Sequence, residues 1–251
     1  MTIHPDAAQG FSAGADAYDR GRPSYPAAAV QHVVAELGIG PGSRVADLGA
    51  GTGKFTELLL PTGATMVAVE PVAEMRAKVA ALPGVEAVEG TGEAIPLPDA
   101  SVDAVTVAQA FHWFDPAAAL AEIARVLRPG GGLGLVWNAR DESVEWVAEF
   151  TRVIDWHNFQ KGHYRAQDWS AVVAGSSNRF TPVAHATFPY AQRLDRTGFV
   201  DRVASVSYIA SMPAAERDAL IAKALAVVAD FPAEFDLPYT TEVWTCRLRS
   251  R

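Results

Sequence analysis

A glycine-rich turn directly after a short apolar segment constrains the fold of this chain more than any other feature. The apolar segment Arg44–Leu48 runs into Gly49-Ala50-Gly51-Thr52-Gly53, and a helical pattern follows. Glycine permits a tight turn and a close approach of the backbone to a ligand, and the first N–H groups of a helix have no partner inside it. A strand, a glycine turn and a helix in this order are typical of the nucleotide-binding edge of an open α/β sheet.

Short apolar segments alternate with helical segments along most of the chain. Strands are expected at Arg44–Leu48, Thr65–Glu70, Val85–Val88, Val102–Ala108, Leu133–Trp137, Val183–Arg193 and Thr240–Leu248. Helices are expected at Pro26–Gly38, Gly53–Leu60, Val72–Leu82, Pro116–Leu127, Glu142–Phe159, Thr197–Ser207 and Ala214–Asp230. Pro129-Gly130 is expected to end the fourth of these helices. The alternation predicts a largely parallel sheet covered by helices.

Charge and hydropathy exclude several classes of partner. The formal net charge is −8, and the lysines and arginines are scattered, so no basic stripe for a nucleic acid is present. No stretch of about 18 apolar residues occurs, and we expect no membrane span. The first ten residues lack a basic and an apolar segment, which argues against a secretory signal. Cys246 is the single cysteine, so no disulfide within the chain is possible, and a reducing cytoplasm is the expected location.

Three glycine-rich nucleotide motifs compete at the turn. A phosphate-binding loop needs a first glycine where this chain has Leu48, and a hydroxyl where it has Phe55. A dinucleotide fingerprint needs a third glycine where this chain has Lys54. The observed spacing, with glycine at every second position from Gly49 to Gly53, suits a cofactor without a pyrophosphate. S-adenosylmethionine is such a cofactor.

Two acidic residues flank the turn. Glu70 stands at the end of the next expected strand, where a carboxylate can accept hydrogen bonds from both hydroxyls of a ribose. An exposed loop acid is the simpler interpretation of Glu70 alone, but the glycine turn favours the ribose contact. Asp47 stands two residues before Gly49. It either caps the turn or attracts the cationic amino group of the cofactor.

Five segments in order resemble the class I S-adenosylmethionine-dependent methyltransferases, most closely the small-molecule branch that includes ubiquinone-biosynthesis and trans-aconitate methyltransferases. The segments are Asp47-Leu48-Gly49-Ala50-Gly51-Thr52-Gly53, Glu70-Pro71, Gly92-Glu93-Ala94-Ile95-Pro96-Leu97-Pro98-Asp99, Val102-Asp103-Ala104-Val105 and Leu127-Arg128-Pro129-Gly130-Gly131. The resemblance extends from Tyr18 to Asn138. It implies a Rossmann-like α/β fold, with a seven-stranded, mostly parallel sheet, helices on both faces and a small helical lid. The implied cofactor is S-adenosylmethionine.

The resemblance also implies which residues bind the cofactor. Gly49 and Gly51 pass beneath it, Glu70 holds the ribose, Val72 or Met75 flanks the adenine, and the loop Thr91-Gly92-Glu93 reaches the adenine. Many relatives have Asp where this chain has Thr91, which weakens the expected adenine contact at that position. The full set of expected cofactor residues is Asp47, Gly49, Ala50, Gly51, Gly53, Glu70, Pro71, Met75, Gly92, Glu93 and Gln109.

Candidate residues for the methyl acceptor lie in three segments. His112 is the candidate acid–base, because the imidazole of histidine ordinarily titrates near neutrality. The alternative is that His112 and Trp113 form an aromatic wall without proton transfer. Tyr18 covers the sulfonium region in the implied arrangement and is the second catalytic candidate. The substrate-pocket residues are Arg22, Trp113, Trp146 and Tyr164, and no metal site is expected.

One domain of residues 1–251 is therefore expected. Its parts are N-terminal cap helices (1–40), a cofactor-binding core (41–138), an acceptor lid (139–182) and the C-terminal part of the sheet and its helices (183–251). The expected function is methyl transfer to a small-molecule carboxylate, hydroxyl or activated carbon. Two alternatives remain open at this stage: a cofactor-binding protein without catalysis, and a nicotinamide-dependent oxidoreductase. The sequence does not determine the oligomeric state.

Overall fold

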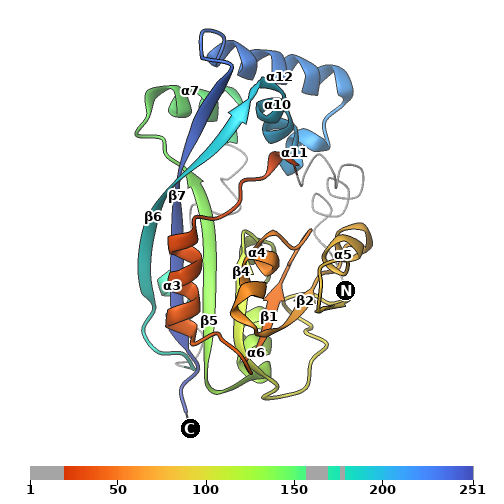
Figure 1. Cartoon of the computed structure of the whole chain (residues 1–251), viewed down its shortest axis with the longest axis vertical. Coiled ribbons are helices and arrows are strands. Elements are labelled where there is room, and N and C mark those ends of the chain that lie inside the picture. The colour runs from red at the N-terminus through yellow and green to blue at the C-terminus, as the bar shows by residue number, and fades with distance from the viewer. Residues whose placement is uncertain (1–19, 157–168, 176–178, 251) are drawn as a thin grey trace. The chain divides into compact units, whose positions relative to one another are not determined.

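Seven strands form one mixed sheet in the computed structural model, which describes residues 20–156, 169–175 and 179–250. The spatial order is β3-β2-β1-β4-β5-β7-β6 (Figure 1). The strands are β1 (Arg44–Leu48), β2 (Thr65–Val69), β3 (Val85–Val88), β4 (Val102–Ala108), β5 (Leu127–Arg140), β6 (Ala184–Asp195) and β7 (Glu234–Arg247). The four pairings from β3 through β5 are parallel. The predicted seven-stranded α/β fold is confirmed.

The strand order reverses its direction of growth at β1. From β1, the chain first builds outward through β2 to β3 and then returns to place β4 on the other side of β1. In open α/β sheets, ligands bind at the carboxyl ends of the strands beside such a reversal. The glycine turn follows β1, so the fold places this turn at the expected binding edge.

The helices follow the predicted order, with shorter bounds in most cases. They are α3 (Ala27–Leu37), α4 (Lys54–Leu59), α5 (Ala73–Val79), α6 (Pro116–Val126), α7 (Glu145–Val153), α9 (Trp169–Gly175), α10 (Arg196–Ala204), α11 (Ser207–Ala210) and α12 (Ala214–Val227), with single 3₁₀ turns at η1 (Leu60–Thr62) and η2 (Phe111–Trp113). Local signals explain several ends. Gly38 ends α3 in the left-handed conformation, with φ of 66°. Asp115 caps α6, and Pro116 occupies its first turn.

The described residues divide into two compact units. The larger unit contains residues 25–137, 169–175, 179–188 and 241–250, and the smaller unit contains residues 20–24, 138–156 and 189–240. In the larger unit, the buried face of α3 joins apolar side chains of β1, α4 and β2 in one core. In the smaller unit, Phe150, Phe199 and Phe235 form the centre of a second core, which includes residues of α7, α10, α12 and β7. Among the described residues, no helix is both long enough and apolar enough to cross a lipid bilayer.

Strand β5 begins six residues before the predicted position, within the segment expected to be a turn. The register with β4 shifts between Val102↔Leu127 and Ala104↔Gly132, so the segment around Pro129-Gly130 bulges out of the ladder. The N–H of Gly130 donates to the carbonyl of Leu248, and the N–H of Leu248 donates to the carbonyl of Gly131. Pairing with a distant segment therefore overrides the local turn signal.

Candidate cofactor site

The glycine turn is fixed in a conformation that favours glycine. Gly49, Gly51 and Gly53 have φ values of 63°, 59° and 90°, all in the left-handed region. The N–H groups of Gly49 and Ala50 both donate to the carbonyl of Val69, at 2.9 and 3.3 Å, and tie the turn to the end of β2. The structure thus joins the two strand ends that the sequence predicted to form one site.

The surroundings of Gly49 and Gly51 differ. A Cβ atom at Gly49 would lie 2.6 Å from the Cβ of Ala110, so a side chain there is excluded by packing. A Cβ atom at Gly51 would meet only the Sδ of Met75, at 3.9 Å, among the described residues. The turn is therefore open beside Gly51, and a ligand can approach its backbone there.

Glu70 lies directly on the turn. Its Oε2 accepts a hydrogen bond from the N–H of Gly51 at 2.8 Å, and its Oε1 accepts one from the N–H of Val72 at 2.9 Å. The residue is 4% exposed, and burial raises the pKa of its carboxyl group, while the two N–H groups act in the opposite direction. The expected proximity of Glu70 to the turn is confirmed. Its contact with a ribose remains a prediction.

Asp47 is buried beneath the turn, with 1% of its surface exposed. It accepts hydrogen bonds from the hydroxyls of Thr56 on α4, at 2.6 Å, and Thr106 on β4, at 2.8 Å. Burial raises its pKa to about 6, although both hydroxyl contacts lower it. The carboxylate thus connects β1 to a helix and a neighbouring strand, two partners that the sequence analysis missed. Attraction of the cofactor amino group remains a prediction.

The loop Thr91-Gly92-Glu93, which is expected to reach the adenine and is called the adenine loop below, is held by hydrogen bonds within its own backbone. Thr91 and Ala94 exchange N–H to carbonyl hydrogen bonds of 3.3 and 3.2 Å. A Cβ atom at Gly92 would lie 2.5 Å from the Cδ2 of Phe114, so the ring packs flat against this glycine. The Oε1 of Glu93 accepts a hydrogen bond from the N–H of Asp115 at 2.8 Å. These contacts attach the adenine loop to the segment that carries His112.

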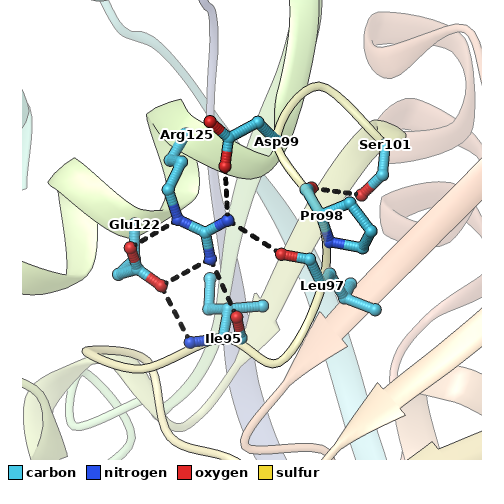
Figure 2. Close-up of polar contacts among 7 residues, drawn as sticks. All are labelled: Ile95, Leu97, Pro98, Asp99, Ser101, Glu122 and Arg125. Atoms are coloured by element: carbon cyan, nitrogen blue, oxygen red, sulfur yellow. Dashed lines mark hydrogen bonds and ion pairs between the residues drawn. The ribbon is translucent and has the colours of Figure 1, made fainter.

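An arginine on α6 holds the continuation of the adenine loop (Figure 2). The Nε of Arg125 and one Nη2 hydrogen donate to the two carboxylate oxygens of Glu122, each at 2.7 Å. The other three hydrogens donate to the carbonyls of Ile95 and Leu97 and to the carboxylate of Asp99, each at 2.8 Å. All five N–H donors of Arg125 are therefore satisfied. The sequence analysis named neither Arg125 nor Glu122.

Gln109 ends β4 in an unusual backbone conformation. Its φ is 57°, in the left-handed region, while its N–H donates to the carbonyl of Val136 at 2.9 Å. For a residue other than glycine this conformation costs roughly 1–3 kcal/mol, and such strain is concentrated at functional sites. The predicted place of Gln109 beside the methionine part of the cofactor remains a prediction.

Aromatic rings surround His112. The ring centroid of His112 lies 4.7 Å from that of Trp113 and 6.4 Å from that of Trp137. Trp137 in turn stacks on Trp169, with centroids 5.0 Å apart and an interplanar angle of 7°. These rings belong to segments far apart in the sequence, so the sequence analysis did not group Trp137 and Trp169 with His112.

The other acceptor candidates lie elsewhere. Arg22 belongs to the smaller unit and donates to the carbonyl of Ser205 at 2.9 Å. Trp146 also belongs to the smaller unit, and its ring meets those of Phe231 and Phe235 edge to face, at 5.2 and 6.0 Å. Their roles in a substrate pocket remain predictions. Tyr18 and Tyr164 lie outside the described residues.

The fold and the site together define a nucleoside-binding α/β protein, and the comparisons identify its class. Residues 46–135 match the methyltransferase domain family. An uncharacterized methyltransferase of Mycobacterium bovis is 42% identical over 242 residues, which cover 94% of this chain and 94% of that protein. This chain belongs to the same family, the class I S-adenosylmethionine-dependent methyltransferases. S-adenosylmethionine is accordingly its cofactor.

Solved structures share the fold. A provisionally assigned methyltransferase from an antibiotic biosynthesis pathway of Anabaena variabilis superposes with a TM-score of 0.66 at 21% identity, over 89% of this chain and 98% of that one. A phosphoethanolamine N-methyltransferase of Haemonchus contortus, solved with S-adenosylhomocysteine, gives 0.59 at 13% identity, over 98% of this chain and 59% of that one. These identities establish the fold alone.

Proposed function

We propose that the protein transfers a methyl group to a small-molecule acceptor by in-line displacement, with the donor held at the glycine turn. The observation that carries the proposal is the hydrogen bond from the N–H of Gly51 to Glu70, at a glycine where a Cβ would meet only Met75 among the described residues. An acid at this position, beside glycine backbone without side chains, fits the ribose of an adenosyl group. The apolar Met75 beside Gly51 fits its base.

The remaining cofactor residues follow from the same arrangement. Val72 or Met75 flanks the adenine, the loop that contains Gly92 and Glu93 reaches it, and Gln109 lies beside the methionine part of the cofactor. When bound, S-adenosylmethionine supplies a methyl group on a positively charged sulfur, which is already activated for displacement. The chain therefore has to align donor and acceptor and exclude water, and positioning of this kind contributes roughly 7–11 kcal/mol to catalysis.

His112 is the proposed proton acceptor. A hydroxyl or an activated carbon loses a proton when it is methylated, and the imidazole of His112, held against Trp113, can take that proton. A carboxylate acceptor needs no base, and His112 and Trp113 then form an aromatic wall. Tyr18 is proposed to cover the sulfonium region. The small-molecule acceptor and a location in the cytoplasm belong to this proposal.

Two substitutions at Gly51 test the cofactor site. Gly51→Ala and Gly51→Arg share the same backbone strain of roughly 1–2 kcal/mol, because both place a Cβ in the left-handed region. Only Gly51→Arg fills the open side of the turn. Titration calorimetry with S-adenosylhomocysteine should show an affinity loss of roughly 100-fold or more for Gly51→Arg and less than about tenfold for Gly51→Ala. An unchanged affinity in a folded Gly51→Arg variant would contradict the proposal.

Activity is measured with cofactor labelled in its methyl group. The wild-type protein is incubated with a panel of small carboxylic acids and phenols, and the label is sought in the small-molecule products. Loss of this transfer in Gly51→Arg, with retention in Gly51→Ala, would assign the transfer to the site. Transfer only to macromolecules would contradict the small-molecule acceptor.

A further inference from the structure

Two arginines are buried in the core of the smaller unit. Arg140, at the end of β5, is 6% exposed, and Arg202, on α10, is 5% exposed. Buried cations are normally paired with a carboxylate. The ion pairs formed by arginines within the described part of this unit involve others: Arg20, Arg152, Arg193 and Arg217. The two buried guanidinium groups have no such partner among the described residues.

Arg140 has few polar contacts. Its Nε donates to the hydroxyl of Thr151 at 3.1 Å, whereas its Nη2 is buried without a hydrogen-bond partner in the described part of the chain. Its guanidinium carbon lies 4.6 Å from the ring centroid of Trp156 and 5.3 Å from that of Phe150. Burial, with a further contribution from the positive charge of Arg202, lowers the pKa of Arg140 to about 9, and the group is still a cation at neutral pH.

Within the described part of the chain, the hydrogen-bond partners of the Arg202 side chain are all uncharged. Its Nε donates to the hydroxyl of Tyr239 at 2.8 Å, and its Nη1 donates to the hydroxyl of Ser205 at 3.4 Å. The hydroxyl of Tyr239 donates onward to the Oε1 of Gln192 at 3.3 Å. Tyr239 also acts electrostatically on Arg140, as does Glu142, which forms no ion pair with it. Two cations thus lie close enough to repel each other, and a second tyrosine, Tyr208, acts electrostatically on both of them.

We propose that Arg140 and Arg202 bind the carboxylate of an organic acid. A guanidinium group presents a planar fork of donors that matches a carboxylate, and the orphaned Nη2 of Arg140 supplies a donor for it. A carboxylate would also remove the repulsion between the two cations. The rings of Trp156 and Phe150 beside Arg140 favour an acid with an apolar or aromatic body.

A comparison of the affinities for carboxylic acids and for their amides tests the proposed carboxylate site. Phenylacetate, 4-phenylbutyrate and octanoate are each compared with the corresponding primary amide, which has the same body without the charge. Each is titrated by calorimetry into the full chain at constant ionic strength, with and without S-adenosylhomocysteine. We expect at least one acid to bind about tenfold or more tightly than its amide. Equal affinity of every acid and its amide would overturn the proposal.

Substitution of each arginine tests whether the preference for the acid over its amide depends on Arg140 and Arg202. Arg140→Met and Arg202→Met should each remove the preference for the acid, while leaving the affinity for S-adenosylhomocysteine unchanged. Arg193→Met is the matched control, because Arg193 is an exposed arginine of the same unit. It should keep the preference. A folded Arg140→Met or Arg202→Met protein that still prefers the acid would overturn the proposal. If Arg140→Met does not fold, the acid preference of Arg202→Met tests the proposal.

The failures of the two proposals are distinguishable. If S-adenosylhomocysteine does not bind the wild-type protein, the proposed function fails, but the acid preference is still measured without the cofactor. If S-adenosylhomocysteine binds and no acid preference is found, only the carboxylate site fails.

Discussion

Two arginines, one in each unit, have opposite environments. Arg125 in the larger unit has a side chain that is 31% exposed, yet every one of its five donors is paired, two of them with Glu122. Arg140 in the smaller unit is buried, yet it makes one hydrogen bond within the described part of the chain. Stability alone would favour the reverse, because an unpaired donor costs most where water is absent. The difference indicates that Arg125 serves the fold and that Arg140 serves a ligand.

The buried acids of the larger unit follow the pattern of Arg125. Asp47 accepts two threonine hydroxyls, and Glu70 accepts two backbone N–H groups. These three charged groups of the larger unit are thus satisfied by its own chain, and the glycine turn is held in place before a ligand binds. The smaller unit leaves two cations for a molecule that arrives from outside. Measurements on single variants can break or sharpen this contrast.

Removal of Arg125 should have the largest effect. Arg125→Met leaves two loop carbonyls without the donors that Arg125 supplies, and it leaves Glu122 with the N–H of Ile95. We expect a loss of roughly 3–4 kcal/mol in the free energy of unfolding. Loosening of the adenine loop should also lower the affinity for S-adenosylhomocysteine by roughly tenfold. Urea unfolding and calorimetry measure the two effects. The control is Arg128→Met, whose exposed pair with Asp103 should contribute less than about 1 kcal/mol. Equal stability of the two variants would contradict the role of Arg125.

The sequence predicted correctly those strands whose ends are marked by neighbouring residues. The bounds of β1, β3 and β4 agree with the expectation, because each is a short apolar segment between residues that favour turns. Strand β5 was predicted too short, because Pro129-Gly130 signals a turn. The backbone partners that extend this strand, Val102 and Leu248, lie elsewhere in the chain. A strand that depends on distant pairing cannot be delimited from its own residues.

The same distinction holds for the site. Gly51 and Glu70 could be predicted because a turn and a strand end have local signatures. The partners of Asp47 could not, since Thr106 is 59 residues away and resembles any other threonine of a strand. Arg125 and Arg140 were missed for a related reason, because the sequence does not show which donors of an arginine are paired. All five donors of Arg125 are paired, whereas the Nη2 of Arg140 is not paired with any described residue. Only the packing of distant segments distinguishes them.

The titration of Asp47 tests whether the larger unit satisfies its own buried charged groups. Its pKa of about 6 lies above the ordinary value of 3.8, so the folded protein keeps this proton to a higher pH than the unfolded chain. The free energy of unfolding should therefore fall as the pH rises from about 4 to 6, by roughly 2–3 kcal/mol in total. Asp47→Asn lacks this titration and also removes the charge of Asp47 that raises the pKa of Glu70, so the difference between the two proteins contains both effects. Unfolding of both proteins by urea at a series of pH values measures the difference, and parallel profiles would show that the carboxylate is better satisfied than its burial indicates.

Arg140→Met should give the smallest change and the opposite sign. The substitution removes a desolvated cation and an orphaned donor and keeps most of the side-chain volume, and replacement of buried charges by apolar residues is often neutral or stabilising. We expect the ligand-free protein to gain roughly 1–2 kcal/mol in its free energy of unfolding, since the lost stacking on Trp156 offsets part of the gain. The matched control is Arg196→Met in the same unit, because Arg196 donates to the carbonyls of Val228, Ala229 and Phe231 and its loss should destabilise the protein. Thermal and urea unfolding of both variants compare a saturated arginine with an unsaturated one in the same unit. If Arg140→Met destabilises the protein as much as Arg196→Met does, Arg140 is a structural residue like Arg125, and the contrast between the two units no longer holds.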